Sequence, residues 1–344
     1  MKILYIGQYT HGTTSKMRSD ALCEILNPDH FEFIDTHIPF YKTSKLWRTI
    51  GFRYKIGPLI SKTNSYVLES LKCFENDFFD LIWVDKGVFL RPSTVKLIKE
   101  KSKKLVHFTP DMSFYMNKSR FFEKAMDTYD FLITTKSKEL PYYYSRIAKE
   151  KIILATQGFS KKTHQIHHEF KDKQNAICFI GLAEPYRIKV AEKILESNIN
   201  LKLAGKGWNK FVAKHKHNIS LSYLGETVLG NDYSKLISSC KFSLGLLSKI
   251  FPELHTTRTF EIPACGTVLL TERNTEIESF FQETDVIFYE NIDDLIGKVK
   301  YFQQHNDELE LIAKNGYSKV HKSGYDNYSI LRRVLERIFI ITKK

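Results

Sequence analysis

The stretch "FPELHTTRTFEIPACGTVLLTE", residues 251–272, contains a short helical segment, a glycine and an apolar run in immediate succession. We predict a helix over 257–264 that ends at Gly266, since glycine is favoured just beyond a helix terminus. The run 267–272 is rich in apolar β-forming residues and predicts a buried strand. A helix followed directly by a buried strand is one step of a βα fold.

The same alternation of strands and helices extends along the whole chain. In the first half, the predicted strands are 2–7, 31–35, 80–85, 104–109, 131–135 and 151–156. In the second half, they are 176–181, 201–205, 220–225, 241–247, 267–272 and 286–290. Apolar runs without alternation are typical of strands covered on both faces, so we predict an α/β fold with two parallel, doubly wound sheets.

The length of 344 residues is too great for one ordinary core, and the polar segment 159–175 interrupts the pattern. We therefore predict two Rossmann-like domains, 1–158 and 176–324, joined by this linker. An amphipathic helix over 325–344 is expected to pack back on the N-terminal domain. Ligands of such sheets bind beyond the carboxyl ends of the strands, so the expected site is a cleft that both domains face.

Composition excludes several classes of protein. Apolar residues make up 42% and charged residues 26% of the chain, as in globular proteins. No apolar run reaches the ~18 residues of a membrane span, and the start reads as a strand, not a signal peptide. The five cysteines form no CxxC pair, so we expect free thiols in a reducing cytoplasm. The net charge of +13 favours an anionic partner.

Two glycine-containing turns in the second half can bind phosphate. Gly181 ends a predicted strand, and Arg187 and Lys189 open the next helix. A helix N-terminus with nearby cations suits an anion. Lys206, flanked by glycines after the following strand, could reach a diphosphate as a point charge. A solvated first helical turn is the alternative interpretation.

Arg258 and Glu261 lie three residues apart on the predicted helix 257–264 and so share one face. This helix follows the carboxyl end of the strand 241–247. A carboxylate at this position can accept hydrogen bonds from the hydroxyl groups of a ribose. The alternative is a surface ion pair, which would contribute only a few tenths of a kcal/mol.

A family resemblance is carried by "FIGLAEPYR" (179–187), "LAGKGW" (203–208), "RTFEIPACGTVLLTE" (258–272) and the tail 313–335. The second domain resembles the carboxyl-terminal half of GT-B glycosyltransferases. It is most similar to the CgeB-like and GT4-like groups (glycosyl transferases group 1). The resemblance implies the GT-B fold and a nucleotide-sugar donor, and it extends to the first half only in architecture.

The resemblance also implies roles for particular residues. Glu261 matches the glutamate that holds the donor ribose, and Glu253 matches the one that contacts the sugar or nearby backbone. Arg187, Lys189 and Lys206 match the basic residues that hold the diphosphate. The CgeB-like pattern keeps the Arg–Phe–Glu core that contains Glu261 and does not rely on the first glutamate.

The first domain is expected to hold the acceptor. His11 lies in the loop after the first strand, and Asp111 follows the strand 104–109. Either side chain could act as a base; an exposed loop histidine and an ordinary turn residue are the alternatives. If the reaction follows GT4 and retains the anomeric configuration, the leaving phosphate helps to deprotonate the acceptor. If it inverts, Asp111 or His11 is needed.

Residues 41–62, "YKTSKLWRTIGFRYKIGPLISK", hold six lysines or arginines and no acidic residue. Together with Trp47, Phe52 and Tyr54, these cations suit an anionic membrane surface or a lipid-phosphate acceptor. A solvated loop is the alternative. No DxD pair for a metal-bound diphosphate stands out, so we expect neither a metal nor a cofactor; helix dipoles and cations can neutralise the leaving group.

The sequence thus predicts a metal-independent, retaining glycosyltransferase. It would move a sugar from a nucleotide-sugar donor to a glycan, lipid-linked or other acceptor, in the synthesis of bacterial surface polysaccharide or a related glycoconjugate. We expect it in the cytoplasm, with peripheral attachment at the inner face of the plasma membrane as an option. A nucleotide-sugar epimerase of GT-B-like architecture remains an alternative. A basic nucleic-acid-binding protein ranks last, because the charge is dispersed, and no nucleic-acid partner is expected.

Overall fold

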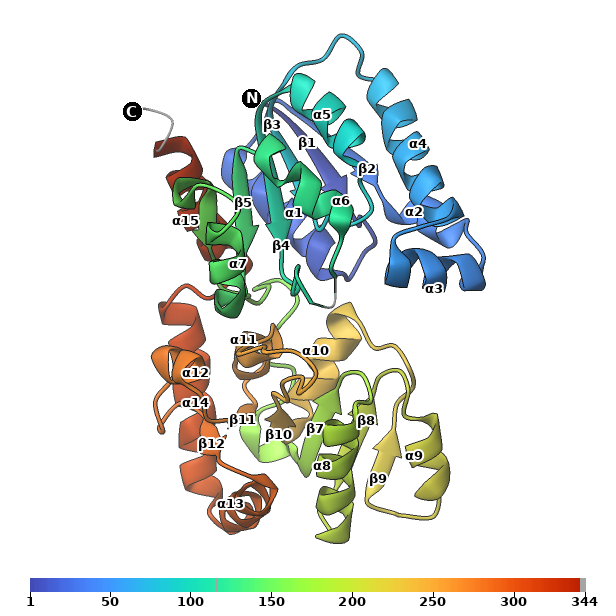
Figure 1. Cartoon of the computed structure of the whole chain (residues 1–344). Helices are drawn as coiled ribbons and strands as arrows, with labels where there is room; N and C mark the ends of the chain where they lie inside the picture. The colour runs from blue at the N-terminus through green and yellow to red at the C-terminus, as the bar shows by residue number, and fades with distance from the viewer. Residues whose placement is uncertain (116, 341–344) are drawn as a thin grey trace. The chain divides into compact units, whose positions relative to one another are not determined.

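The computed structural model describes residues 1–115 and 117–340 of the chain. They form two compact units (Figure 1). The first unit comprises Met1–Thr156 together with the chain from Ile330 onward, and the second comprises Gln157–Ser329. The last helix of the chain therefore belongs with its first strands.

The first unit is built on a parallel six-stranded sheet with the order β2-β1-β3-β4-β5-β6. Its strands are β1 (Lys2–Gly7), β2 (His30–Asp35), β3 (Phe79–Asp85), β4 (Ser102–Thr109), β5 (Phe131–Thr134) and β6 (Ile152–Leu154). Its helices are α1 (Thr14–Leu26), α2 (His37–Tyr41), α3 (Lys45–Tyr54), α4 (Pro58–Lys72), α5 (Pro92–Glu100), α6 (Arg120–Ala125), α7 (Leu140–Tyr144) and α15 (Asn327–Ile340).

The apolar run of strand β1, Ile3 to Ile6, is explained by its burial on both faces of the sheet. Ile3 and Tyr5 belong to one core cluster, Leu4 and Ile6 belong to another, and all four side chains are fully buried. Successive side chains of a strand point to opposite faces of the sheet, so both faces carry a core. The prediction of strands covered on both faces is confirmed.

Helix α15 closes one of these two cores. Leu331, Val334, Leu335 and Ile338 are buried in the cluster that also contains Tyr5 of β1. Their spacing of three and four residues is that of one helical face. The predicted packing of the C-terminal helix on the N-terminal unit is confirmed.

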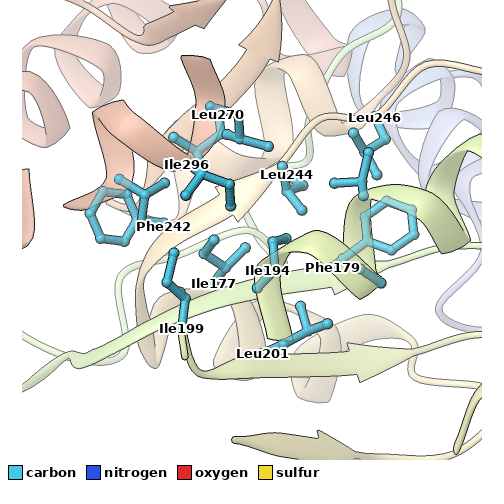
Figure 2. Packing of buried hydrophobic residues seen from close by; sticks show 14 of the residues in the cluster. Ile177, Phe179, Ile194, Ile199, Leu201, Phe242, Leu244, Leu246, Leu270 and Ile296 are labelled. Carbon is cyan, nitrogen blue, oxygen red and sulfur yellow. The ribbon is translucent and has the colours of Figure 1, made fainter. Parts of the chain in front are cut away.

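The second unit is built on a parallel six-stranded sheet with the order β12-β11-β10-β7-β8-β9. Its strands are β7 (Gln174–Ile180), β8 (Leu201–Ala204), β9 (Leu221–Tyr223), β10 (Cys240–Leu244), β11 (Val268–Glu272) and β12 (Ile287–Tyr289). Its helices are α8 (Pro185–Glu196), α9 (Asn209–Lys214), α10 (Gly230–Ser238), α11 (Arg258–Ala264), α12 (Thr275–Phe280), α13 (Ile292–Gln304) and α14 (Asn306–Lys322). Figure 2 shows one core of this unit, where Ile177 and Phe179 of β7 pack with Leu244 of β10 and Ile194 of α8. The two predicted parallel sheets are confirmed.

The segment predicted as a linker, 159–175, and the basic segment 41–62 both have specific structure. Phe159, at the head of the polar segment 159–175, is fully buried within the second unit. Its N–H donates to the carbonyl of Tyr325 at 3.2 Å, and its own carbonyl accepts from the N–H of Asn327 at 2.8 Å. Within 41–62, the backbone forms α3 and the start of α4, so the solvated-loop interpretation of that segment is wrong.

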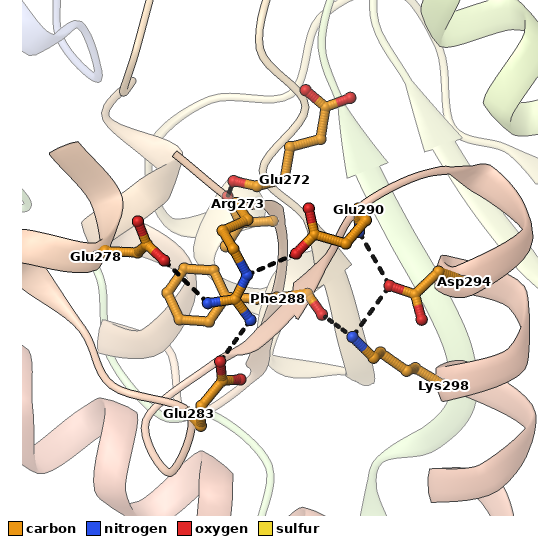
Figure 3. A network of polar contacts seen from close by, with 9 residues as sticks. Glu272, Arg273, Glu278, Glu283, Phe288, Glu290, Asp294 and Lys298 are labelled. Carbon is orange, nitrogen blue, oxygen red and sulfur yellow. Dashed lines mark hydrogen bonds and ion pairs between the residues drawn. The ribbon is translucent and has the colours of Figure 1, made fainter. Parts of the chain in front are cut away.

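Arg273, directly after β11, gathers acidic side chains at one end of the second sheet (Figure 3). Its guanidinium donates to Glu278 at 3.0 Å and to Glu290 at 2.6 Å, and it also contacts Glu283. These bonds tie α12 and the end of β12 to β11. We assign this network to stability, since none of the predicted donor residues belongs to it.

Candidate active site

The carboxyl ends of β7 and β8 form two loops that touch through their backbones. Gly205 has φ of +134°, and a Cβ at this position would lie 1.9 Å from the carbonyl oxygen of Gly181. The indole Nε1 of Trp208 donates to the same oxygen at 2.8 Å. Glycine is therefore required at Gly205 both by its backbone conformation and by the space available. The two predicted phosphate-binding turns lie together in the fold.

Arg187 of α8 and Arg258 of α11 converge on the loop after β10. Their Nη2 atoms donate to the carbonyl of Leu246 at 3.4 Å and 3.2 Å, respectively. Both guanidinium groups also lie within 6 Å of the ring of Phe179, at 5.8 Å and 5.7 Å. The sequence suggested each arginine separately, and the structure places them side by side.

This arginine pair concentrates positive charge in a partly buried site. Burial lowers the pKa of Arg187, and the neighbouring charge of Arg258 lowers it further. Two carboxylates oppose this effect: Glu184, whose Oε1 lies 2.9 Å from Nη1 of Arg187, and Glu253. The Nε atoms of both arginines are buried without a hydrogen-bond partner. An anion placed here would relieve the repulsion between the two guanidinium groups.

Glu261 is almost fully buried on α11. Its Oε2 accepts a hydrogen bond from the hydroxyl of Tyr233 at 2.6 Å, and its Oε1 lies 3.7 Å from Nε2 of His164. The N–H of Ser160 donates to Nδ1 of His164 at 2.9 Å, so neutral His164 carries its proton on Nε2, facing Glu261. The alternative interpretation of Glu261, half of a surface ion pair with Arg258, is wrong because its partners are Tyr233 and His164.

The remaining predicted donor residues are less enclosed. Glu253 is half-buried in the loop after β10, close enough to Arg187 to favour its charged form. Lys206 is exposed in the turn after β8, and its carbonyl accepts from the N–H of Ala183 at 2.9 Å. Lys189 is exposed on α8. Because residues two apart on a helix do not face each other, Lys189 points away from the direction of Arg187.

Sequence reasoning did not identify Tyr233 or His164. Tyr233 lies on α10, and His164 lies in the polar segment that follows β6. Neither is part of a local motif with Glu261, and only the fold brings the three together. What distinguishes this tyrosine and this histidine is that they are buried. Burial cannot be read from the sequence around either residue, so no sequence signal could have identified them.

A separate cavity of about 180 Å³ opens at the carboxyl ends of the strands of the first unit. Asp111, Lys86, His37 and Asn117 contribute polar groups to its lining. Lys86 and Asp111 form an ion pair at 2.8 Å. Burial alone would raise the pKa of Asp111, but Lys86 outweighs it and the pKa is lowered. His11 is exposed and does not line this cavity.

The loop that carries Asp111 is held from below by a buried carboxylate. Glu139 is fully buried, and its two oxygens accept from the N–H groups of Ser113 at 2.8 Å and Phe114 at 2.7 Å. Neighbouring Asp85 is buried in a bidentate pair with Arg18, at 2.8 Å and 3.0 Å. Both of these carboxylates are already bound to other groups of the protein. Asp111 is therefore the acidic side chain that the cavity offers to a ligand.

Among the described residues, 1–115 and 117–340, no group of three or more His, Cys, Asp or Glu side chains is arranged to hold a metal ion. No helix in the same part of the chain has the length and apolar character to cross a bilayer.

Comparison with known proteins finds a family model that matches the carboxyl-terminal part of the chain. Residues 187–336 match the family described as "Glycosyl transferase-like". The match begins at Arg187 and includes Lys206, Tyr233, Arg258 and Glu261. With its two parallel sheets, the chain has the GT-B fold.

Solved structures show the same two-sheet fold over the whole chain. HepE of Anabaena, in complex with UDP and glucose, matches with a TM-score of 0.67 at 12% identity, over 98% of this chain and 99% of its own. Sucrose-phosphate synthase of Thermosynechococcus elongatus matches with 0.66 at 11%, over 99% and 100%. A UDP-N-acetylglucosamine 2-epimerase matches with 0.57 at 12%, over 100% and 97%. No curated protein sequence matches this chain significantly.

Proposed function

We propose that this protein is a glycosyltransferase that binds a nucleotide-sugar donor in its second unit, at the carboxyl ends of β7, β8 and β10. The observation that carries the proposal is the convergence of Arg187 and Arg258 on the carbonyl of Leu246. Two guanidinium groups suit a diphosphate, which accepts several hydrogen bonds and carries negative charge that offsets theirs. Lys206 would approach the diphosphate from the turn after β8.

In this proposal Glu261 binds the ribose. Tyr233 occupies one side of Oε2, while Oε1 lies 3.7 Å from His164, beyond ordinary hydrogen-bond distance. A carboxylate has about four acceptor positions on its two oxygens, so Oε1 keeps capacity for a ribose hydroxyl. Glu253 would contact the sugar, because it lies near Arg187 and therefore near the proposed diphosphate.

The acceptor would bind the cavity of the first unit, beside Asp111. A base that is paired with Lys86 and has a lowered pKa is a weak base near neutral pH. This favours the retaining course, in which the leaving phosphate helps to deprotonate the acceptor, and gives Asp111 the role of orienting an acceptor hydroxyl. His11, exposed and outside the cavity, is the weaker candidate. Arginines and backbone donors would neutralise the leaving diphosphate without a metal.

We propose that the acceptor is a glycan or a lipid-linked glycan of a surface polysaccharide or related glycoconjugate. The five cysteines are free thiols, which supports a reducing compartment such as the cytoplasm, where nucleotide sugars would be available. The GT-B neighbour HepE was crystallised with UDP and glucose. UDP-sugars are therefore the first donors to test.

A thermal-shift panel of UDP-, GDP-, CMP- and ADP-sugars tests the donor site. We expect at least one donor to raise the melting temperature of the wild-type protein and to lose that effect in Arg258→Gln. Arg332→Gln, an exposed arginine of α15 in the first unit, is the matched control and should behave as wild type. No shift from any donor in the wild-type protein would contradict the proposal.

Product analysis then separates transfer from the alternatives. Incubation of the active donor with and without candidate glycan acceptors should give a glycosylated product only when the acceptor is present. An epimerised nucleotide sugar formed without acceptor would instead establish the epimerase. Salt-sensitive binding of nucleic acid with no response to any nucleotide sugar would establish the nucleic-acid-binding alternative.

A further inference from the structure

Helix α3 of the first unit leaves most of its apolar side chains in solvent. Of its ten residues, Gly51 alone is classed as buried. Leu46 is 67% exposed and Tyr54 is 60% exposed. Including the residues that flank the helix, the exposed large apolar side chains are Tyr41, Leu46, Trp47, Phe52, Tyr54 and Ile56. We call residues 41–56 the α3 lobe; Figure 1 shows α3 beside α2 and α4, at one edge of the first unit.

The lobe is attached firmly, so these side chains are held outward by the fold. A Cβ at Gly51 would lie 2.8 Å from Cβ of Leu59 on α4, which shows how closely the two helices pack. The ring of Trp47 lies against Gly57, 2.8 Å from where a Cβ would be. Lys55 ends α3 in a left-handed conformation, and its Nζ donates to the carbonyl of Phe52. The glycines and Lys55 thus fix α3 on α4, while Leu46, Tyr54 and the flanking Ile56 remain exposed.

The charge of the lobe is of one sign. From Thr36 to Leu68 the chain contains six lysines or arginines and no aspartate or glutamate. Lys42, Lys45 and Arg53 are exposed within the lobe. A soluble surface ordinarily mixes both signs of charge and avoids grouped apolar side chains. Grouped cations around grouped apolar side chains have the chemistry of a surface that meets anionic lipid head groups and the acyl region beneath them.

We propose that the α3 lobe binds the surface of an anionic lipid bilayer. Leu46, Trp47 and Ile56 would enter the interfacial region, where tryptophan is favoured. Lys42, Lys45 and Arg53 would contact lipid phosphates. The lobe would lie in the plane of the membrane–water interface and would not cross the bilayer. This activity does not require the donor site.

The lobe also reaches the cavity that contains Asp111. Phe52 of α3 lines that cavity together with Phe40 of α2. If the cavity binds the acceptor, as the proposed function holds, then a bilayer at the lobe would bring lipid-linked acceptors to the rim of their own pocket. A lipid-linked acceptor is accordingly the class that this arrangement favours.

Vesicle sedimentation of the full chain, without any nucleotide sugar, tests the proposal separately from catalysis. The protein should bind phosphatidylcholine vesicles that contain phosphatidylglycerol more tightly than phosphatidylcholine alone, and added salt should weaken this binding. Leu46→Glu and Lys45→Glu should each reduce the affinity at least about fivefold. The matched controls are Leu311→Glu on α14 and Lys300→Glu on α13, which are exposed and lie outside the lobe.

Tryptophan fluorescence gives a second readout, since of the three tryptophans Trp83 and Trp208 are fully buried and Trp47 is 41% exposed. Anionic vesicles should shift the emission of the wild-type protein to shorter wavelength, and Trp47→Phe should lose the shift while still sedimenting. Absence of binding to anionic vesicles would overturn the proposal. Lobe variants that bind vesicles as tightly as the controls would also overturn it. So would a protein that does not bind vesicles but forms a concentration-dependent dimer that Leu46→Glu abolishes.

Discussion

The hydroxyl of Tyr233 donates a hydrogen bond to Oε2 of Glu261 across 2.6 Å, inside the second unit. Burial raises the pKa of this tyrosine, and the carboxylate raises it further, so the hydroxyl keeps its proton and remains a donor. A hydrogen bond to a buried charged acceptor is stronger than one between neutral groups. Tyr233 therefore fixes the orientation of Glu261, and with it the direction in which the other oxygen is presented.

Tyr233→Phe should weaken donor binding without unfolding the protein. Hydrogen bonds to charged groups contribute about 1.5–3 kcal/mol, and part of this would be lost from a correctly oriented Glu261, so we expect the Kd for the donor to rise about tenfold. Isothermal titration calorimetry measures it. Tyr301→Phe is the control, because its exposed hydroxyl contacts Glu308 on the surface. An unchanged Kd in a folded Tyr233→Phe protein would show that Tyr233 does not position a ribose-binding group.

Gly205→Ala should separate the two phosphate-binding turns. The added Cβ would lie 1.9 Å from the carbonyl oxygen of Gly181, and the backbone at φ of +134° is unfavourable for alanine. We expect a loss of at least about 2 kcal/mol of stability together with weakened donor binding. Gly297→Ala on α13 is the matched control: nothing lies within 4 Å of its added Cβ, and it should stabilise by about 0.5–1 kcal/mol. Equal effects of the two substitutions in chemical denaturation would contradict this account of Gly205.

Asp85→Ala should destabilise the first unit by about 3–5 kcal/mol, because it leaves the buried guanidinium of Arg18 without its partner. Asp20→Ala, which removes an exposed partner of Lys16, should cost less than about 1 kcal/mol. Urea denaturation measures the free energy of unfolding of the two variants. A small effect at Asp85 would mean that Arg18 finds another anion, or water, when the pair is broken.

Lys173 should make stability depend on pH in the alkaline range. It is buried, donates to the carbonyl of Ser238 at 2.6 Å, and burial lowers its pKa from 10.5 to about 8. Between these values the unfolded chain binds one proton more than the folded chain, so stability rises with pH from about 8 towards 10.5. In Lys173→Met this contribution to the slope should disappear. Parallel pH profiles for the two proteins would show that Lys173 keeps its proton when buried.

Much of the fold could be predicted from the sequence because strand burial leaves a local record. The apolar run of β1 and the glycine after α11 are visible without neighbours, and the helix–strand alternation follows from them. Arg258 and Glu261 were identified for the same reason, since both lie on one short helix at a strand end.

The missing parts depend on contacts between distant residues. Tyr233 meets Glu261 from 28 residues away, and Arg18 meets Asp85 from 67 residues away. Neither contact changes the local pattern around its members. The helix α3 was missed for a different reason. Its apolar residues do recur at helical spacing, as Leu46 and Ile50 do, but the many cations of the segment suggested a membrane-facing segment or a solvated loop.

The central claim is that Arg187 and Arg258 together hold a diphosphate, and calorimetric titration with the nucleoside diphosphate of the most active donor tests it most directly. We predict that Arg187→Gln and Arg258→Gln each raise the Kd at least about tenfold, since each removes a charge-assisted bond, while Arg332→Gln leaves it unchanged. Folded variants that bind the nucleoside diphosphate as tightly as the wild-type protein would contradict the claim and place the donor elsewhere.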